Sequence, residues 1–182
     1  MGRVITFGHS LGTVEYTVLE SPVGPLTVFA GSGVLMGVEF GDNRADFESD
    51  LEPVHRLRRS GRIKPHGDPA GAVSALRSYF AGDLTALDRL AVDPIGTPFQ
   101  LRVWSALRSV PTGRTASYGD IARAIGAPKS VRAVGAANGA NPIAIVVPCH
   151  RIIGSAGSLV GYGGGLDRKR WLLEHEGVLL RM

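Results

Sequence analysis

Cysteine is nearly absent from this sequence: one thiol, Cys149, stands in 182 residues. A single cysteine excludes an internal disulfide and any multi-cysteine zinc site. The histidines other than His150 show no spacing typical of metal ligands, so we expect no metal; they are His9, His55, His66 and His175. A free thiol suits a reducing compartment, and we expect a cytoplasmic protein.

Long apolar runs and a secretory signal are also lacking. The longest uninterrupted apolar run covers residues 143–147, which is far too short to span a bilayer. Residues 1–9 do not contain the apolar stretch of a signal peptide, so we expect no membrane partner. Hydrophobic residues still make up 44% of the chain, which is enough for a real core in one large or two small domains.

Acidic residues are scarce in the second half of the chain only. Residues 1–93 hold nine Lys or Arg and twelve Asp or Glu, a net charge of −3, whereas residues 94–182 hold eleven and four, a net charge of +7. A basic half beside an acidic half points to a polyanion as the partner of the second half. On charge alone, a basic surface that serves only solubility is an equal alternative.

The first half contains three short segments with the alternation and β-branched residues typical of strands, at residues 14–19, 26–30 and 34–40. Turns containing Pro or Gly separate them, and this pattern predicts a three-stranded meander.

Two helices are expected in the rest of the first half. One covers residues 44–51, and the other runs from about residue 70 to Gly82, which stands where a helix ends. Residues 56–71 are rich in charge, Gly and Pro and predict a loop. We find no residue in this half that suggests chemistry.

The second half begins after a Pro- and Gly-containing connection at residues 93–98. Thr97 is expected to cap a helix with Pro98 at its first position. An apolar stripe at helical spacing supports this helix: Phe99, Val103, Leu107 and Val110.

Two further helices follow. Ser117 is expected to cap the first, which Gly126 ends, and Ser130 is expected to cap the second, at residues 131–139. Two helices joined by a short turn predict a helix-turn-helix in which the second is the recognition helix. That helix is nearly free of bulky side chains, which suits either entry into a DNA groove or tight packing against neighbouring helices.

Cys149 is followed directly by His150, a base that favours the reactive thiolate. Adjacent side chains on an extended segment point apart, so a contact between them requires a bend at Pro148 or a bridging water. Residues 143–147 are interpreted as a short buried strand that carries Cys149 to a pocket. A packed core cysteine beside an incidental histidine is the alternative interpretation of this pair alone.

Three motifs together resemble the O6-alkylguanine-DNA alkyltransferase family, also called methylated-DNA–protein-cysteine methyltransferases. They are Pro148-Cys149-His150-Arg151 after Asn141-Pro142, the run Gly161-Tyr162-Gly163-Gly164-Gly165-Leu166, and Trp171-Leu172-Leu173-Glu174-His175-Glu176-Gly177. The resemblance is dense from residue 97 to 177 and weaker from 16 to 40. It implies an α/β (α+β) fold: a small ribonuclease-H-like sheet domain at residues 1–93, and a winged-helix-like helix-turn-helix domain at residues 94–182 that carries the active site.

The resemblance also implies the reaction. Cys149 would take the alkyl group from O6-alkylguanine in double-stranded DNA, with O4-alkylthymine as a second candidate substrate. His150 would act as base through a water, Glu176 would orient His150, and Tyr118 would bond the flipped base and protonate it as it leaves. The thioether cannot be removed, so each molecule would act once. No cofactor is implied.

The family's DNA contacts carry over by position. The recognition helix would lie in the minor groove, with Arg132 inserted into the base stack while the damaged base is flipped out. The other expected DNA contacts are Ser117, Lys129, Ser130, Ala133, Gly135 and Ala136. The expected pocket consists of Tyr118, Asn138, Ile152, Tyr162, Gly163 and Gly164, with Asn141 as structural support.

Three other functions are weighed against this one. A lesion-binding relative without a reactive cysteine is disfavoured by Cys149. A cysteine hydrolase using Cys149, His150 and Glu176 would leave the basic half without a purpose, and a transcriptional regulator would have to distinguish base sequence. We expect a monomer in solution that binds damaged duplex DNA, with clustering along DNA left open.

Overall fold

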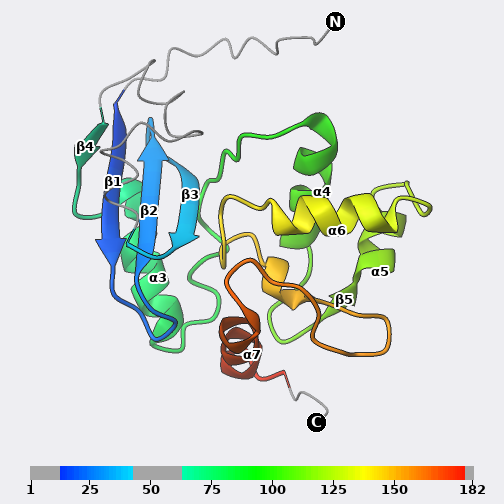
Figure 1. The fold of residues 1–182 in the computed structure, drawn as a ribbon. Helices are drawn as coiled ribbons and strands as arrows, with labels where there is room; N and C mark the ends of the chain where they lie inside the picture. Colours follow the sequence, from blue (N-terminus) through cyan, green and yellow to red (C-terminus); the bar gives the residue numbers. More distant parts are fainter. Residues whose placement is uncertain (1–12, 43–62, 179–182) are drawn as a thin grey trace, which may run out of the picture.

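The computed structural model describes residues 13–42 and 63–178. A sheet with one covering helix forms the first half of the chain, and a group of helices and turns forms the second (Figure 1). The fold is therefore a mixed α/β arrangement, as the sequence predicts. Within the described ranges, no helix has both the length and the apolar character needed to cross a membrane.

The sheet contains the predicted meander. Strands β1 (Val14–Leu19), β2 (Leu26–Gly31) and β3 (Val34–Phe40) pair antiparallel in the order β3-β2-β1. A fourth strand, β4 (Ile63–Pro65), pairs parallel to β1 at the edge of the sheet. The prediction of a loop is therefore wrong for these three residues, because a short edge strand ending in proline lacks the alternation that marks a strand.

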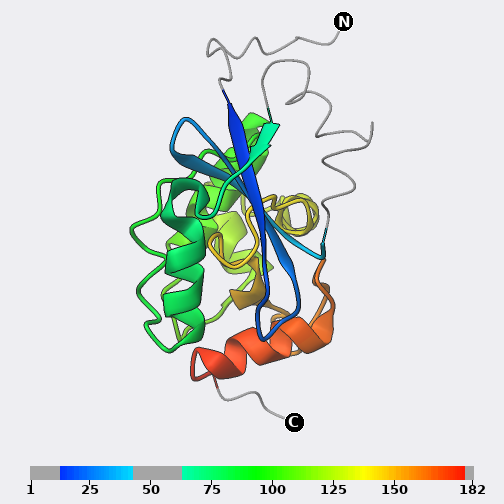
Figure 2. The same ribbon diagram turned by 90° about the vertical axis from the view of Figure 1, so that its left-hand side faces the viewer.

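One helix covers a face of this sheet. Helix α3 (Ala72–Phe80) follows a 3₁₀ turn, η1 (Pro69–Gly71), and lies along the strands (Figure 2). It ends as predicted, because Gly82 has a φ of +108° in the left-handed region. The helix expected at residues 44–51 lies outside the described residues, as does the part of the expected loop before residue 63.

The second half contains the predicted helix-turn-helix. Helix α4 (Pro98–Arg108) comes first, and α5 (Tyr118–Ala124) and α6 (Val131–Gly139) form the pair. Thr97 and Ser117 cap α4 and α5 through reciprocal capping boxes, as predicted.

Ser130 differs from the other two predicted caps. It precedes α6 as expected, but its side chain makes no capping hydrogen bond. Its backbone, at φ −97° and ψ 26°, is not extended as it is at Thr97 and Ser117, so the hydroxyl does not reach the first turn of the helix.

Short elements complete the second half. The 3₁₀ turn η2 (Cys149–Arg151) leads into strand β6 (Ile152–Ile153), which pairs parallel with β5 (Ala116–Ser117). Helix α7 (Leu166–His175) then runs below the ends of the sheet strands (Figure 2). The pairing of β5 with β6 brings the start of α5 next to the cysteine turn.

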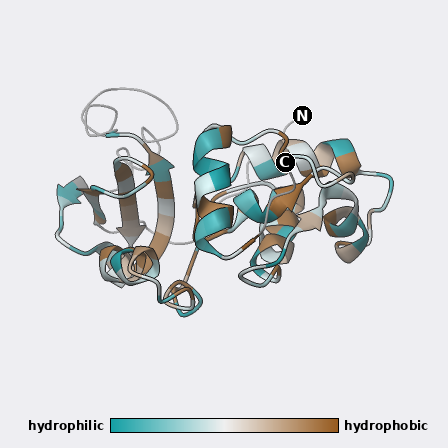
Figure 3. Ribbon diagram, turned by 90° about the horizontal axis from the view of Figure 1, so that it is seen from below, coloured by the Kyte–Doolittle hydropathy of each residue, from teal (hydrophilic) through white to brown (hydrophobic). Residues whose placement is uncertain are grey.

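Backbone hydrogen bonds from β3 join the two halves at Val38, which donates to Pro142 O and accepts from Ala144 N. Leu35 of the same strand exchanges bonds with Ala91 and Asp93 at the end of the first half. One hydrophobic core extends from the sheet through α4 and α6 to α7. Figure 3 shows the halves side by side, with hydrophobic residues in the strands of the sheet. The segment before Cys149 is thus held by the edge of the first-half sheet.

Candidate active site

The buried run before Cys149 is a compact turn. Ile143 makes a single bridge to Val38, Ile145 has a φ of +70°, and Val147 N donates to Ile143 O. The predicted strand at 143–147 is therefore wrong. An apolar run without periodicity indicates burial, but it does not distinguish a strand from a buried turn.

Asn141 holds this turn together. Its Oδ1 accepts a hydrogen bond from Ile143 N at 3.0 Å, and its Nδ2 donates to Val147 O at 2.8 Å. The same Nδ2 lies 3.0 Å from Cys149 Sγ, as a donor to the sulfur. Asn141 thus has the bracing contacts expected of it, and also a direct contact with the thiol that the sequence did not indicate.

Cys149 is buried, with 6% of its surface exposed. Burial raises the pKa of its thiol, and the hydrogen bond from Asn141 opposes this rise. The resting side chain is therefore a thiol at neutral pH. A base is needed before the sulfur can act as a nucleophile.

His150 and Glu176 form a fully buried pair, with Nε2 of the imidazole 2.9 Å from Oε1 of the carboxylate. Burial lowers the pKa of His150. Burial opposes ionisation of Glu176, but its hydrogen bonds from His150 and Arg151 outweigh this and lower its pKa to about 2. The pair is therefore a neutral imidazole that donates its Nε2–H to a carboxylate.

The other ring nitrogen of His150 is available as a base. Nδ1 is buried and has no hydrogen-bond partner among residues 13–42 and 63–178. Because Nε2 carries the proton, Nδ1 holds the lone pair. The structure thus pairs His150 with Glu176, directly after the buried Cys149 in the chain. That the three residues act together stays a prediction.

Two residues bonded to Glu176 were missed by the sequence analysis as site residues. Arg151 donates from Nε to Glu176 Oε2 at 2.8 Å and from Nη2 to Oε1 at 2.9 Å. Tyr79, from α3 in the first half, donates its hydroxyl to Glu176 Oε1 at 2.9 Å. The place of Arg151 beside His150 was a usable signal, but nothing in the local sequence marks Tyr79.

Two tyrosines of the expected pocket lie close to the thiol. Tyr118 is half-buried, and burial and the nearby Cys149 raise the pKa of its hydroxyl. Burial and Cys149 also raise the pKa of Tyr162, whose hydroxyl is buried without a hydrogen-bond partner in the described part of the chain. Both phenols therefore stay protonated and can donate to a ligand.

Lys169 was also missed, and it binds the backbone of Ile152, a residue of the expected pocket. Its ammonium is buried and donates to Ile152 O at 2.5 Å and to Val160 O at 2.8 Å. Burial lowers the pKa of Lys169 to about 8. The carbonyl of Ile152, a residue of the expected pocket, thus already accepts a hydrogen bond from this lysine.

The glycine-rich loop of the expected pocket rests on the first half. A Cβ added to Gly164 would lie 2.6 Å from the ring of Phe40, so only glycine permits this close approach. Arg168 donates to Gly164 O at 2.9 Å and to Val23 O at 2.7 Å. Gly163 is exposed, and a Cβ there would lie 3.9 Å from Gly139 O at the end of α6.

Helix α6 has one buried and one exposed face. Val134, Ala137 and Asn138 are buried, and Ala137 O accepts a hydrogen bond from the indole of Trp104. The buried Asn138 Oδ1 has no partner within the described ranges. Tight packing therefore accounts for the inner face only.

The outer face of α6 carries most of the expected DNA contacts. Lys129, Arg132, Ala133 and Ala136 are exposed, and Ser117, Ser130 and Gly135 are half-buried. A Cβ on Gly135 would lie 3.8 Å from the ring of Tyr118, so this side of the helix also borders the pocket. The arrangement leaves a slim helix with a basic start facing solvent.

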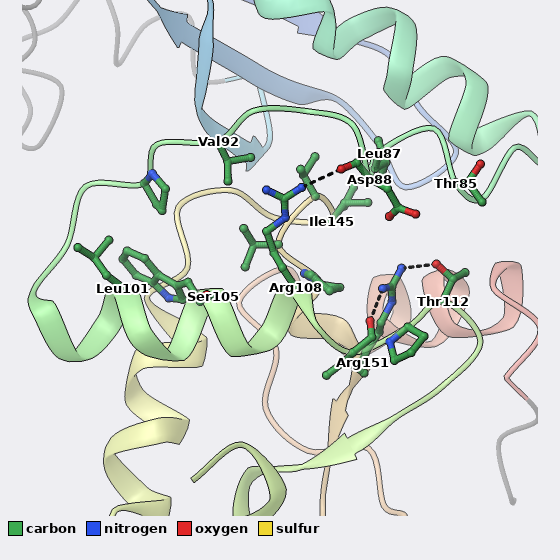
Figure 4. A pocket seen from close by; sticks show the side chains of 17 residues that line it. Thr85, Leu87, Asp88, Val92, Leu101, Ser105, Arg108, Thr112, Ile145 and Arg151 are labelled. Carbon is green, nitrogen blue, oxygen red and sulfur yellow. Dashed lines mark hydrogen bonds between the residues drawn. The ribbon is translucent and has the colours of Figure 1, made fainter. Parts of the chain in front are cut away.

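A cavity lies elsewhere, between the two halves. Its volume is about 850 Å³, and it is lined in part by Leu87, Arg108, Val147 and Arg151 (Figure 4). Arg108 crosses it to bond the carbonyls of Asp88 and Leu90. Its lining does not include Cys149, Tyr118 or Tyr162, so this cavity is separate from the expected pocket.

Known proteins resemble both halves of the chain. The family model described as 6-O-methylguanine DNA methyltransferase, ribonuclease-like domain, matches residues 14–94. The model described as 6-O-methylguanine DNA methyltransferase, DNA binding domain, matches residues 98–178.

Curated relatives and solved structures are similar over most of their length. A methylated-DNA–protein-cysteine methyltransferase from Mycobacterium tuberculosis H37Rv is 48% identical over 163 residues, which cover 90% of this chain and 92% of that protein. One from Salmonella typhimurium LT2 is 47% identical, covering 89% and 95%. The crystal structure of Mycobacterium tuberculosis OGT in complex with DNA matches with a TM-score of 0.72 at 48% identity, covering 90% and 92%.

Proposed function

The chain belongs to the family of 6-O-methylguanine DNA methyltransferases, and from this membership we propose that Cys149 takes the alkyl group from O6-alkylguanine in duplex DNA. The family repairs DNA by alkyl transfer to a protein cysteine, and this chain has one cysteine. The observation that carries the assignment is the buried cluster in which Cys149 contacts Asn141 and directly precedes the paired His150.

The first step is the removal of the thiol proton. His150 Nδ1, with its lone pair and no protein partner in the described residues, accepts the proton through a bridging water. Glu176 stabilises the imidazolium that forms. The Asn141 amide donates to the sulfur and stabilises the thiolate left behind.

The second step is displacement at the alkyl carbon. The Cys149 sulfur forms a bond to this carbon while the bond from the carbon to guanine O6 breaks, and its electron pair passes to the base. Tyr118, half-buried near Cys149, donates a proton to the departing guanine, and the proton that His150 took from the thiol passes through water to the Tyr118 phenolate. The products are a thioether and an unmodified guanine, and no second cysteine is present to remove the alkyl group. Each molecule therefore reacts once.

The lesion must leave the base stack before the sulfur can reach it. We assign DNA binding to the exposed face of α6, whose small Ala133, Gly135 and Ala136 let the backbone enter the minor groove. Arg132, exposed near the start of α6, fills the space left by the flipped base. Lys129, Ser130 and Ser117 contact the phosphates.

The expected pocket receives the flipped base between Tyr118, Tyr162 and the glycine loop. Three buried or half-buried groups can bond its edge: the hydroxyls of both tyrosines and the amide oxygen of Asn138, which has no partner in residues 13–42 and 63–178. Gly163 contributes its backbone N–H. The Ile152 carbonyl keeps a second lone pair for the amine of guanine besides the one that Lys169 uses. O4-alkylthymine is the second candidate for the same pocket.

We further propose that residues 1–93 form the support domain and residues 94–182 the DNA-binding and alkyl-transfer domain, since the two matching family models meet between residues 94 and 98. We place the protein in the cytoplasm as a monomer. Clustering along DNA stays a prediction.

The deciding experiment is the intact mass of the protein after mixing with excess duplex that contains O6-methylguanine. We expect a gain of one methyl group, never more, because each thiol reacts once. A Cys149→Ser variant should gain none while it still binds the duplex. Tight binding by the wild type without any gain in mass would contradict the transfer and favour a protein that only marks the lesion. Repeated turnover of an ester or amide would favour a hydrolase.

The role of α6 has its own test. An Arg132→Ala variant should react with the duplex lesion on the order of 10²-fold more slowly, because the flipped state loses its support. Its rate with free O6-alkylguanine base should equal that of the wild type, since no flipping is needed. Equal losses with both substrates would contradict a role of Arg132 in flipping and indicate damage to the pocket.

A further inference from the structure

Glu176 binds four hydrogen-bond donors from two parts of the fold, although it is fully buried. His150 Nε2, Arg151 Nη2 and the Tyr79 hydroxyl each lie 2.9 Å from Oε1, and Arg151 Nε lies 2.8 Å from Oε2. His150 and Arg151 come from η2 beside the cysteine. Tyr79 comes from α3, in the half of the chain that the sequence marked as mere support.

The Tyr79 hydroxyl is held in place from several sides. The residue is completely buried, and its ring packs edge-on against Phe80 at 5.3 Å and His175 at 5.0 Å. His175 Nε2 bonds Tyr79 O at 2.8 Å, and the His175 ring stacks on Trp171 at 4.9 Å. The hydroxyl thus meets the carboxylate from a fixed direction.

This contact does more than satisfy a buried polar group. Oε1 is the oxygen of Glu176 that accepts the Nε2–H of His150. Any other donor to Oε1 therefore competes with the imidazole for the negative charge on this oxygen. Arg151 already neutralises the carboxylate with a bidentate contact. Tyr79 adds a neutral donor that fixes the carboxylate's rotation without adding charge.

We propose that Tyr79 is a positioning residue of the alkyl-transfer site: its hydroxyl, supplied by the first half of the chain, fixes the orientation of Glu176 and shares Oε1 as an acceptor with His150, and thereby sets the basicity of His150. This inference rests on the proposed role of Cys149, His150 and Glu176. It means that the sheet domain takes part in the reaction through one hydrogen bond.

The consequence is a specific change with pH. The charged or titratable groups that face the His150–Glu176 pair come from three elements. They are Tyr79 from α3, Arg151 from η2, and Lys169 from α7, which acts on His150 from a greater distance. Of these, a Tyr79→Phe change removes one donor to Glu176 and no charge. The carboxylate then holds the imidazolium more strongly, so the acidic limb of the pH–rate profile should move to higher pH.

The experiment measures the single-turnover rate of methyl transfer from an O6-methylguanine duplex to the full-length protein, followed by intact mass from pH 5 to pH 9. For Tyr79→Phe we expect a rate on the order of tenfold lower at neutral pH, a shifted acidic limb, and unchanged affinity for the duplex. Phenylalanine fits the same space, so the variant should fold.

Two matched variants separate this role from simple loss of stability. Phe80→Leu disturbs the aromatic cluster around Tyr79 but changes none of the donors to the Glu176 carboxylate. Tyr16→Phe removes a tyrosine hydroxyl elsewhere, in strand β1 of the sheet. Neither should move the acidic limb. Melting temperatures of all variants should be recorded with the rates.

Two results would overturn the inference while the alkyl transfer stands. The first is a wild-type rate and pH profile for Tyr79→Phe. The second is a fall in the rate of Tyr79→Phe without a shift of the acidic limb, if Phe80→Leu shows the same fall, because Tyr79 would then be a packing residue only. A wild type that gains no methyl group would remove the proposed function itself, and this inference with it.

Discussion

The two halves of the molecule differ most in what they bury. Among the described residues of the first half, the buried polar groups are the side chain of Thr27 and the hydroxyl of Tyr79, whereas the second half buries Asn138, His150, Arg151, Lys169 and Glu176. The buried side-chain atoms without a partner in the same ranges all lie in the second half, on Asn138, His150 and Tyr162.

This contrast separates stability from chemistry. A core of apolar side chains between a sheet and a helix carries a smaller desolvation penalty, because burying polar groups costs free energy unless they are hydrogen-bonded. A reacting site needs such groups, held in place and partly unsatisfied until substrate arrives. The second half can hold them because β3, Phe40 and Tyr79 of the first half brace the segments on which they stand.

The largest expected effect is in the charge cluster. Arg151→Leu leaves Glu176 as a buried carboxylate without its counter-charge, so the free energy of unfolding should fall by about 3–5 kcal/mol. Methyl transfer should be lost with it. Arg108→Leu is the control, because Arg108 donates to the carbonyls of Asp88 and Leu90 at the boundary of the halves. This substitution should lower the free energy of unfolding by about 1 kcal/mol. Equal losses in urea unfolding would mean that the cluster is not specially dependent on its ion pair.

The next effect concerns the sheet. Leu26 is fully buried in β2, and Leu26→Ala should lower the free energy of unfolding by about 2–5 kcal/mol. The rate constant of methyl transfer should stay at the wild-type value at temperatures where the variant is folded, because Leu26 lies in β2 and is none of the residues assigned to the site. A reduced rate in fully folded protein would show that packing within the sheet, and not only Tyr79, acts on the chemistry.

The smallest expected effect is a loss of stability toward acid pH, which is absent at neutral pH. Glu176 has its pKa lowered to about 2 in the folded protein, so the stability it contributes is present above its unfolded pKa and is lost as the pH falls toward about 2. Burial also lowers the pKa of His150, so the unfolded chain binds this proton first as the pH drops below about 6.5. Urea midpoints should therefore fall from pH 7 to pH 3, and less steeply for Glu176→Gln. An identical slope in that variant would place the acid-sensitive groups elsewhere.

Much of the fold was predictable from local patterns. The strands of the meander, the helices after Thr97 and Ser117, and the helix-turn-helix follow from periodicity and capping, which depend on residues a few positions apart. The failures are instructive. The run at 143–147 satisfied its backbone with a turn and with β3, a partner about a hundred residues away, and no local pattern contains that partner.

The residues of the site also fall into two groups, those predicted from the sequence and those found only in the structure. The sequence by itself indicated Cys149 as the candidate nucleophile, because the family resemblance requires a cysteine and the chain has one, and the same resemblance predicted roles for Glu176, Tyr118 and Asn141. Only the tertiary structure decided which groups complete the site. Tyr79 meets Glu176 across 97 positions and Lys169 meets Ile152 across 17, and such contacts arise from packing of distant segments rather than from spacing along the chain.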